Sequence, residues 1–327
     1  MTDIARTARI TRTGGPEVIE WIDAPLAPPA PGEVRFRTRA VGLNYIDAYH
    51  RSGLYRIDLP SGLGSEAAGV VEAVGGASDG FQVGDRVGTF GPSRGAYASA
   101  RNVAVEELVH LPAGVDDRAA AALLLKGGTA AMLVEQCARV QPGQTVLVHA
   151  AAGGVGHLLV GWLKAVGAVV IGSVGNDEKA EIARAAGADH VLIHSRADVA
   201  AQVRAITDDA GAAVVLDGVG KATWATSLAA TARRGMIVSY GNASGAVEGV
   251  NLGTLSAHGS LFVTRPTLFD YATTQSERQA MADRVFEMLA RGAIDPVIGQ
   301  QFPLEEAAAA HRAMEAGETH GSTILIV

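Results

Sequence analysis

Short apolar runs recur through the middle of the sequence, and they limit more than any other feature what this chain can fold into. Six such runs cover 145–149, 169–174, 190–193, 212–217, 236–240 and 260–263. Helical patterns fill most of the intervals, notably 154–166, 177–186 and 198–207. Strands that are apolar on both faces and alternate with helices are typical of a parallel sheet covered on both sides. The pattern therefore predicts an α/β domain with a doubly wound parallel sheet.

The segment that precedes this pattern has a different character. Gly and Pro punctuate residues 4–110, which contain β-type runs at 8–13, 34–41, 70–74 and 85–90. A helical pattern follows Asp116, which we interpret as an N-cap, and the pair Gly127 and Gly128 is expected to break that helix. The first part of the chain is therefore predicted to be mainly β structure with helices after it.

The segment that follows residue 265 is too short to fold alone. It reads as two helices, 277–290 and 304–314, and a last strand at 322–327. We expect that strand to rejoin the first β segment. The sequence thus predicts a nucleotide-binding domain at 126–265, inserted into a catalytic domain made of 1–125 and 266–327.

Composition excludes several classes of protein. The formal net charge is −7 and no block of Lys and Arg occurs, so nucleic acid is an unlikely primary ligand. A single cysteine, Cys137, excludes an internal disulfide, a four-cysteine zinc ribbon and a cysteine-held iron–sulfur cluster. The N-terminus lacks the apolar core of a signal peptide, and no apolar run is long enough to cross a membrane. A soluble, cytoplasmic protein with no membrane partner is expected.

A glycine-rich turn, HAAAGGVG at 149–156, follows the first buried strand and opens an apolar helix. In the frame G-x-G-x-x-G its positions are Ala151, Gly153 and Gly156. Gly153 allows a pyrophosphate to approach the backbone closely, and Gly156 allows the helix to pack tightly on the strand. The backbone N–H groups of Gly154 and Val155 would lie at the helix N-terminus, which favours an anion. A Rossmann dinucleotide site is predicted, the alternative being a turn without a ligand.

The end of the second strand bears on which dinucleotide binds. A site for NAD carries Asp or Glu there to accept a hydrogen bond from the ribose 2′-hydroxyl. Here the first carboxylate is Asp177, and Ser173 and Lys179 offer a donor and a cation, which favours NADPH. Lys179 could instead simply solvate the helix face. His194, at the end of the next strand, could help to enclose the phosphate or could be an ordinary surface residue.

The segment 42–55 concentrates polar and aromatic side chains in one loop or short helix: Asn44, Tyr45, Asp47, Tyr49, His50 and Tyr55. Phenol and amide groups can donate to a carbonyl oxygen, and aromatic faces can pack against a flat substrate. We interpret this segment as a substrate pocket. The alternative is a loop whose tyrosines only cover the core.

Residues 64–69, GSEAAG, resemble the G-H-E-x-x-G segment of zinc alcohol dehydrogenases in the medium-chain dehydrogenase/reductase superfamily. Ser65 stands where that family has the zinc-binding histidine, and Asn44 stands where it has a cysteine ligand. A hydroxyl and an amide are poor zinc ligands, so metal catalysis is not expected.

Within that superfamily the chain is most similar to the quinone oxidoreductases of the ζ-crystallin-like branch. The blocks that carry this resemblance lie at 14–18, 42–55, 59–69, 149–156, 239–247, 259–268 and 320–327. The resemblance implies a GroES-like, β-rich catalytic domain, a homodimer, and an NADPH-dependent reductase of a small quinone without a metal. It also implies that the strand near 259–264 pairs across the two-fold axis of the dimer.

The resemblance further implies roles for individual residues. It assigns Asn44 and Thr129 to the nicotinamide side, and Gly153, Gly154 and Val155 to the pyrophosphate. It assigns Ser173 and Lys179 to the 2′-phosphate, and puts Tyr240, Asn242, Val263 and Arg265 on segments that close over the cofactor. The family often has tyrosine at the position of His194. We expect NADPH to lie across the cleft between the domains, its nicotinamide facing a pocket lined by Asn44, Tyr49 and Tyr55.

Two other functions remain open at this point. An NADPH-dependent reductase of α,β-unsaturated aldehydes or ketones could use the same pocket, because an enone also needs its oxygen polarised. A non-catalytic NADPH-binding protein, crystallin-like or RNA-binding, is the rival from a different class. The acidic net charge argues against RNA, and the tyrosine-rich segment argues for a substrate.

Overall fold

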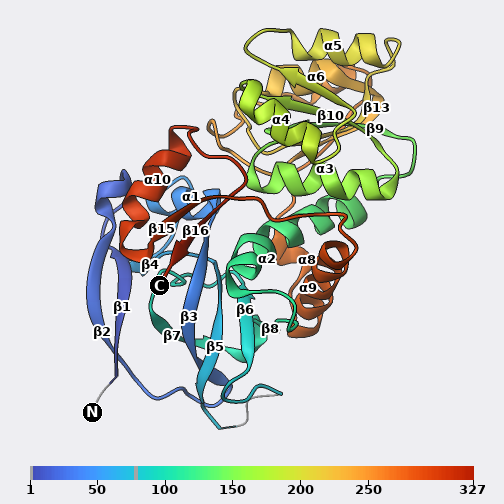
Figure 1. Cartoon of the computed structure of the whole chain (residues 1–327). Coiled ribbons are helices and arrows are strands. Elements are labelled where there is room, and N and C mark those ends of the chain that lie inside the picture. The colour runs from blue at the N-terminus through green and yellow to red at the C-terminus, as the bar shows by residue number, and fades with distance from the viewer. Residues whose placement is uncertain (1–2, 77–79) are drawn as a thin grey trace. The chain divides into compact units, whose positions relative to one another are not determined.

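The chain divides into two compact units in a computed structural model that describes residues 3–76 and 80–327 (Figure 1). Unit 1 runs from the N-terminus to Gly128 and adds Tyr271–Phe286 and Pro296–Val327. Unit 2 comprises Thr129–Asp270 and Glu287–Asp295. The chain therefore enters unit 2 twice, the second time only for the short segment Glu287–Asp295.

Unit 1 is built on a seven-stranded sheet of order β15-β16-β3-β5-β6-β8, with β7 also paired to β3. The strands are β3 (Glu33–Leu43), β5 (Glu66–Val74), β6 (Arg86–Phe90), β7 (Ala100–Ala104), β8 (Leu108–His110), β15 (Ile298–Pro303) and β16 (Ser322–Ile326). The last strand, β16, is antiparallel to β3, with Leu325 opposite Val41. The prediction that the C-terminal strand rejoins the first β segment is confirmed. A smaller sheet contains β2 (Glu20–Leu26), β1 (Asp3–Ile10) and β4 (Ser61–Gly62).

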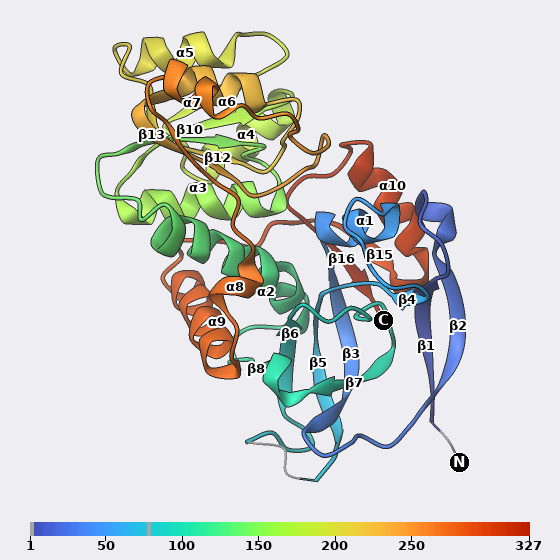
Figure 2. The same ribbon diagram turned by 180° about the vertical axis from the view of Figure 1, so that it is seen from behind.

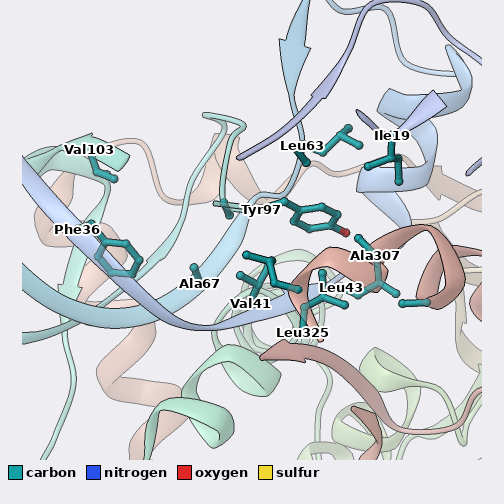
Figure 3. Close-up of a cluster of buried hydrophobic side chains, with 14 of the residues drawn as sticks. Ile19, Phe36, Val41, Leu43, Leu63, Ala67, Tyr97, Val103, Ala307 and Leu325 are labelled. Atoms are coloured by element: carbon teal, nitrogen blue, oxygen red, sulfur yellow. The ribbon is translucent and has the colours of Figure 1, made fainter. Parts of the chain in front are cut away.

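The core of unit 1 lies between these strands and a C-terminal helix, α10 (Ala307–Glu315). Figure 3 shows Phe36 and Val41 of β3 in the same cluster as Ala307 of α10 and Leu325 of β16. Tyr97 is fully buried in this cluster. Its hydroxyl is a polar group inside an apolar core, so it requires hydrogen-bond partners there.

The helix α2 (Asp117–Ala131) corrects one prediction from the sequence. Its start is as expected, because the Asp116 carboxylate accepts from the N–H of Ala119 at 2.7 Å. The predicted break at Gly127 and Gly128 is wrong, since the helix continues through both. A Cβ on Gly127 would lie 2.6 Å from Cγ1 of Val285, on α9 (Gln275–Ala290), so the glycine permits close helix packing.

Unit 2 is a six-stranded parallel sheet of order β11-β10-β9-β12-β13-β14 (Figure 2). Its strands are β9 (Thr145–His149), β10 (Val169–Val174), β11 (His190–Ile193), β12 (Ala212–Asp217), β13 (Thr231–Ser239) and β14 (Phe262–Thr264). The first four coincide with predicted strands, whereas β13 begins five residues before the predicted 236. This is the strand order of a Rossmann domain.

Helices cover both faces of the unit 2 sheet. They are α3 (Gly154–Val166), α4 (Asp177–Ala185), α5 (Val199–Ile206), α6 (Trp224–Ala230) and α7 (Leu252–Ala257). The helices α3 and α4 contact each other on one face, and α5 and α6 pack together on the other, where Val203 and Leu228 join Leu147 in one apolar cluster. The prediction of a doubly wound parallel sheet together with a separate β-rich unit is confirmed.

The remaining helices are short or lie at unit boundaries: α1 (Tyr45–Ser52), α8 (Leu268–Tyr271) and a π-helical turn, Met132–Cys137, that extends α2. Within the described residues, no helix combines the length and apolar character that crossing a membrane requires.

Candidate active site

Unit 2 gathers most of the predicted cofactor residues at one edge of its sheet. The carboxyl ends of parallel strands meet at the same edge, and ligands of such sheets bind there. Residues at or just beyond these ends include Gly153 after β9, Ser173 in β10, His194 after β11, Tyr240 after β13 and Arg265 after β14. Val263 instead lies within β14, opposite Ile237, and its side chain is exposed.

The glycine-rich turn has the geometry of an anion site. Gly153 is the N-cap of α3, and neither a capping side chain nor an acidic residue is present in the first turn of that helix. The N–H groups of Gly154 and Val155 therefore meet no competing carboxylate there, which suits a pyrophosphate. A Cβ on Gly156 would lie 2.1 Å from the carbonyl oxygen of Ala150, so the predicted packing role of this glycine is confirmed.

A buried Ser, His and Asp meet beside this turn, and their geometry is that of a structural brace. The Ser227 hydroxyl donates to Asp217 at 2.7 Å and lies 3.1 Å from Nε2 of His149. Asp217 also accepts from the N–H groups of Val219 and Gly220, at 2.9 Å each. Because Ser227 is fully buried and its proton points to the carboxylate, it cannot act as a nucleophile on a substrate. The network instead fixes the loop after β12.

Arg265 stabilises the segment that follows β13. Its Nη1 donates to the carbonyl oxygens of Ser239, at 3.0 Å, and Gly241, at 2.9 Å. Tyr240 lies between those two residues, and its ring covers Gly218, where a Cβ would come within 2.7 Å of Cζ. Arg265 therefore positions the Tyr240 and Asn242 backbone rather than projecting freely toward a ligand.

The residues predicted to recognise a 2′-phosphate lie around the turn between β10 and α4. Ser173 is buried in β10, and the N–H of Lys179 donates to the N-cap side chain of Asn176 at 2.9 Å. His194 is held by its N–H to the Val174 carbonyl at 3.0 Å, and its Nε2 lies 3.5 Å from where a Cβ of Gly175 would be. The fold thus brings Ser173, Lys179 and His194 to one turn.

In unit 1 the predicted substrate segment forms α1 and the loop after it. Tyr49 and Tyr55 make an edge-to-face pair with ring centroids 5.1 Å apart. The left-handed Gly53, with φ of 86°, ends the helix and turns the chain back so that these rings meet. Tyr45 has a different role, because its hydroxyl donates to the Met314 carbonyl at 3.1 Å.

Asn44 belongs to a buried polar cluster with Glu66 and Lys126. Nδ2 of Asn44 donates to Oε2 of Glu66 at 2.8 Å and to the Gly42 carbonyl at 3.2 Å. The Lys126 ammonium lies 3.3 Å from the same Glu66 oxygen, and Oε1 of Glu66 accepts from the N–H of Leu125 at 2.7 Å. All three side chains are at least nine-tenths buried.

This cluster narrows the role of Asn44. Both hydrogens of its amide are used within the protein, and Oδ1 faces the Asp47 N–H in a capping box at the start of α1, so the only capacity left to meet a ligand is a remaining lone pair of the acceptor Oδ1. The NH₂ end of the Asn44 amide must face Glu66, because the Glu66 carboxylate beside the Lys126 ammonium can only accept hydrogen bonds. Asn44 is therefore suited to receive a hydrogen bond, such as one from a carboxamide, and not to donate one to a substrate oxygen.

The sequence analysis missed Lys126. It follows three leucines in an apolar run, and a lysine inside such a run is a detectable signal, because an unpaired buried ammonium is costly. Glu66 appeared in the sequence only as the acid of the segment GSEAAG at 64–69, with no role assigned to it. Gly42 explains how the carboxylate reaches its place: a Cβ there would lie 2.1 Å from Oε2 of Glu66.

The residues at this place do not fit a zinc ion. The amide of Asn44 is turned to Glu66, and the Lys126 ammonium already occupies the cationic position beside that carboxylate. A second, divalent cation there would be repelled by the ammonium. Across residues 3–76 and 80–327, no group of three or more His, Cys, Asp and Glu side chains could hold a metal.

A second buried network links α1 to α10. The backbone N–H of Asn44 donates to Oδ2 of Asp47 at 3.0 Å, and the Tyr97 hydroxyl donates to the same oxygen at 3.1 Å. Nε2 of His311 lies 3.0 Å from that hydroxyl. Burial raises the pKa of Asp47 to about 7, while burial and then the Arg51 guanidinium lower the pKa of His311 to about 3.

Comparison with known proteins places this arrangement in a class. Residues 154–291 match the family model of zinc-binding dehydrogenases, and residues 30–113 match the alcohol dehydrogenase GroES-like domain. The fold, the glycine-rich turn and the buried Asn44 cluster thus define a medium-chain dehydrogenase/reductase, with a cluster that does not suit zinc.

Individual relatives narrow the class to a family. A quinone oxidoreductase of Pseudomonas aeruginosa is 51% identical over 99% of this chain and all of its own length. The structure of Escherichia coli quinone oxidoreductase complexed with NADPH matches with a TM-score of 0.96 at 42% identity, covering 98% of this chain and 100% of that one. A 2-haloacrylate reductase of Burkholderia is 42% identical over 98% of each chain. The chain belongs to the quinone oxidoreductase family.

Replacing Lys126 tests the buried cluster. Lys126→Met would leave the Glu66 carboxylate buried without its cation, so we expect the free energy of unfolding to fall by about 3 to 5 kcal/mol. Lys126→Met combined with Glu66→Gln should recover part of that loss. Denaturant unfolding followed by circular dichroism measures both.

The control for this experiment is Lys164→Met, which breaks the partly exposed pair with Asp189 and should cost about 1 kcal/mol or less. A double variant less stable than Lys126→Met alone would contradict the ion-pair interpretation.

The second network predicts two pH effects of opposite sign. The pKa of His311 is lowered on folding, so its contribution to stability is present above pH about 6.5 and is lost as the pH falls toward 3. The pKa of Asp47 is raised on folding, so its contribution is present at low pH and is lost as the pH rises toward 7.

The stability difference between wild type and His311→Gln should therefore shrink when the pH falls from about 7 to about 4.5, whereas the difference between wild type and Asp47→Asn should grow. Urea midpoints at the two pH values provide the measurement. Differences that change in the same direction would show that these protonation states are assigned wrongly.

Proposed function

We propose that this protein is a zinc-independent NADPH:quinone oxidoreductase that transfers reducing equivalents from NADPH to a small quinone. The observation that carries the proposal is the nearly full-length likeness to quinone oxidoreductases, one of them solved with NADPH. The acid-free first turn of α3 and the zinc-incompatible Asn44 cluster agree with it.

The residues of unit 2 supply the cofactor site in this proposal. The N–H groups of Gly154 and Val155 bind the pyrophosphate, and Ser173, Lys179 and His194 surround the 2′-phosphate. The segment with Tyr240 and Asn242, which Arg265 stabilises, closes over the dinucleotide, and Thr129 and Asn44 face the nicotinamide. Bound NADPH supplies the reducing equivalents, and the protein supplies binding and orientation.

The residues of unit 1 orient the substrate. A quinone is flat, so the edge-to-face rings of Tyr49 and Tyr55 offer an aromatic surface that suits it. The amide of Asn44 contributes an acceptor rather than a donor, because its hydrogens bind Glu66 and Gly42. Solvent can supply the proton.

Reduction of an α,β-unsaturated carbonyl compound is the second candidate. A specific observation supports it: a relative 42% identical over 98% of the chain is a 2-haloacrylate reductase. A non-catalytic role is less well supported. The aromatic pair of Tyr49 and Tyr55 suits a flat substrate, and a formal charge of −7 disfavours RNA.

A steady-state screen tests the function. We expect turnover of 1,4-benzoquinone or a naphthoquinone with NADPH, a higher KM with NADH, and weaker turnover of an alkenal, because the aromatic pair suits a flat ring. Absorbance of the reduced nicotinamide follows each reaction. Faster turnover of the alkenal would favour the second candidate, and NADPH binding without turnover of either substrate would favour the non-catalytic one.

We also propose that the protein is a homodimer joined through β14. This strand is the last in the order of the unit 2 sheet, and its Phe262 and Val263 are 57% and 38% exposed. Leu252 on the nearby helix α7 is 79% exposed. An exposed apolar strand at the end of a sheet is a template for pairing with a second copy.

The single cysteine, which needs no oxidising compartment, supports a cytoplasmic location.

Phe262→Asp tests this dimer. A two-fold contact places the new charge in the interface twice, so we expect the variant to elute as a monomer in size-exclusion chromatography with light scattering. Val83→Asp, which changes a 62% exposed residue of unit 1, should remain dimeric. A monomeric wild type, or a dimeric Phe262→Asp, would show that β14 is not the interface.

A further inference from the structure

The loop after β11 wraps around the turn that joins β10 to α4. Three consecutive residues make this contact. The N–H of His194 donates to the Val174 carbonyl at 3.0 Å, the Ser195 hydroxyl donates to the Gly175 carbonyl at 3.2 Å, and Arg196 reaches Asp177. The contacts of His194 and Ser195 therefore hold the loop, and with it the backbone of Arg196, independently of the bonds that the Arg196 side chain makes.

Arg196 and Asp177 form a bidentate ion pair. Nη1 of Arg196 lies 2.7 Å from Oδ1 of Asp177, and Nη2 lies 2.5 Å from Oδ2. The guanidinium hydrogen bond lowers the pKa of Asp177, and the same bond raises the pKa of Arg196. Both carboxylate oxygens therefore face the guanidinium, and the negative charge of Asp177 is neutralised locally.

The position of Asp177 gives this neutralisation a consequence. Asp177 is the first residue of α4, directly after the N-cap Asn176 and two residues before Lys179. Asp177 does not occupy the end of β10, where an NAD site carries its ribose-binding acid, but lies three residues beyond it, and its negative charge would still repel a 2′-phosphate bound at this turn. The turn that should accept a phosphate thus carries an acid beside it.

We propose that Arg196 is a specificity-determining residue, which makes NADPH acceptable by neutralising Asp177 and holding its carboxylate away from the 2′-phosphate. The inference rests on the proposed function, and it names the charge balance by which that same site prefers NADPH over NADH. Arg196 acts through Asp177 and does not contact the phosphate. The side chains of both residues are mostly exposed, so the pair adds little to stability and its effect is on the ligand.

A double-mutant cycle tests the proposal with Arg196→Gln, Asp177→Asn and the two combined. Arg196→Gln uncovers the acid, so KM and the dissociation constant for NADPH should rise about tenfold, while the values for NADH change by about twofold or less. Asp177→Asn alone should leave NADPH binding within about twofold of wild type, and the double variant should return to that level. Quinone reduction gives KM, and quenching of protein or enhancement of nicotinamide fluorescence gives the dissociation constant.

Two references calibrate the cycle. Arg291→Gln removes an arginine from another exposed pair of unit 2, with Glu287, and should leave both cofactors unaffected. Lys179→Ala should raise KM for NADPH with no rescue by Asp177→Asn, because a lysine that touches the phosphate acts directly. The effect of Arg196→Gln should also shrink as salt is added.

The outcomes separate this inference from the proposed function. Rescue in the double variant supports neutralisation. A double variant as weak as Arg196→Gln would mean that Arg196 binds the phosphate itself, and an Arg196→Gln indistinguishable from wild type would mean that it has no role; either overturns the proposal. A wild type that binds neither NADPH nor NADH would overturn the proposed function, and this inference with it.

Discussion

The buried carboxylate of Glu66 is the constraint on which the arrangement of β5, α1 and α2 in unit 1 depends. A charge at such depth is tolerated only with a full set of donors. Glu66 obtains three donors from two places along the chain: the Asn44 amide before α1, and the Leu125 backbone N–H and Lys126 ammonium in α2. The carboxylate therefore fixes β5, the start of α1 and the middle of α2 with respect to one another, and it presents Asn44 in one orientation.

Asn44 is held from both ends. Its amide serves Glu66, while its backbone N–H serves Asp47, which Tyr97 joins to His311 on α10. The two networks also interact electrostatically. After burial and its own hydrogen bonds, the pKa of Asp47 is lowered by Lys126 and raised by Glu66. A change in either network is therefore felt at Asn44, the residue that both share, and this rigidity agrees with the role proposed for Asn44 beside the nicotinamide.

Local patterns account for what the sequence could predict. The glycine-rich turn, the strands β9 to β12 and the N-cap at Asp116 follow from short-range rules that leave a signature in consecutive residues. Gly127 and Gly128 show where such rules fail: glycine is needed there because Val285 and Met281 approach from a helix more than 150 residues later in the chain. The lysine that ends the apolar run at 123–126 is itself a local signal, but its partner Glu66 lies 60 residues away and cannot be found from it. The return of Glu287–Asp295 to unit 2 also has no local signal.

Two acids, Asp217 and Asp177, lie near the carboxyl ends of the unit 2 strands, and their negative charges are compensated in two different ways. Asp217 is fully buried and is neutralised by backbone N–H groups and hydroxyls, so its role is to shape the loop after β12. Asp177 is exposed, and its hydrogen-bonded charge partner is the Arg196 guanidinium from the next strand's loop, with a smaller electrostatic contribution from Arg184. The charge of the buried Asp217 is balanced by groups of the fold itself, so it cannot be altered without altering the fold. The charge of the exposed Asp177 is balanced mainly by one arginine side chain, which can be replaced. Preference for a dinucleotide can therefore change at Arg196 and Asp177 without disturbing the sheet that carries them.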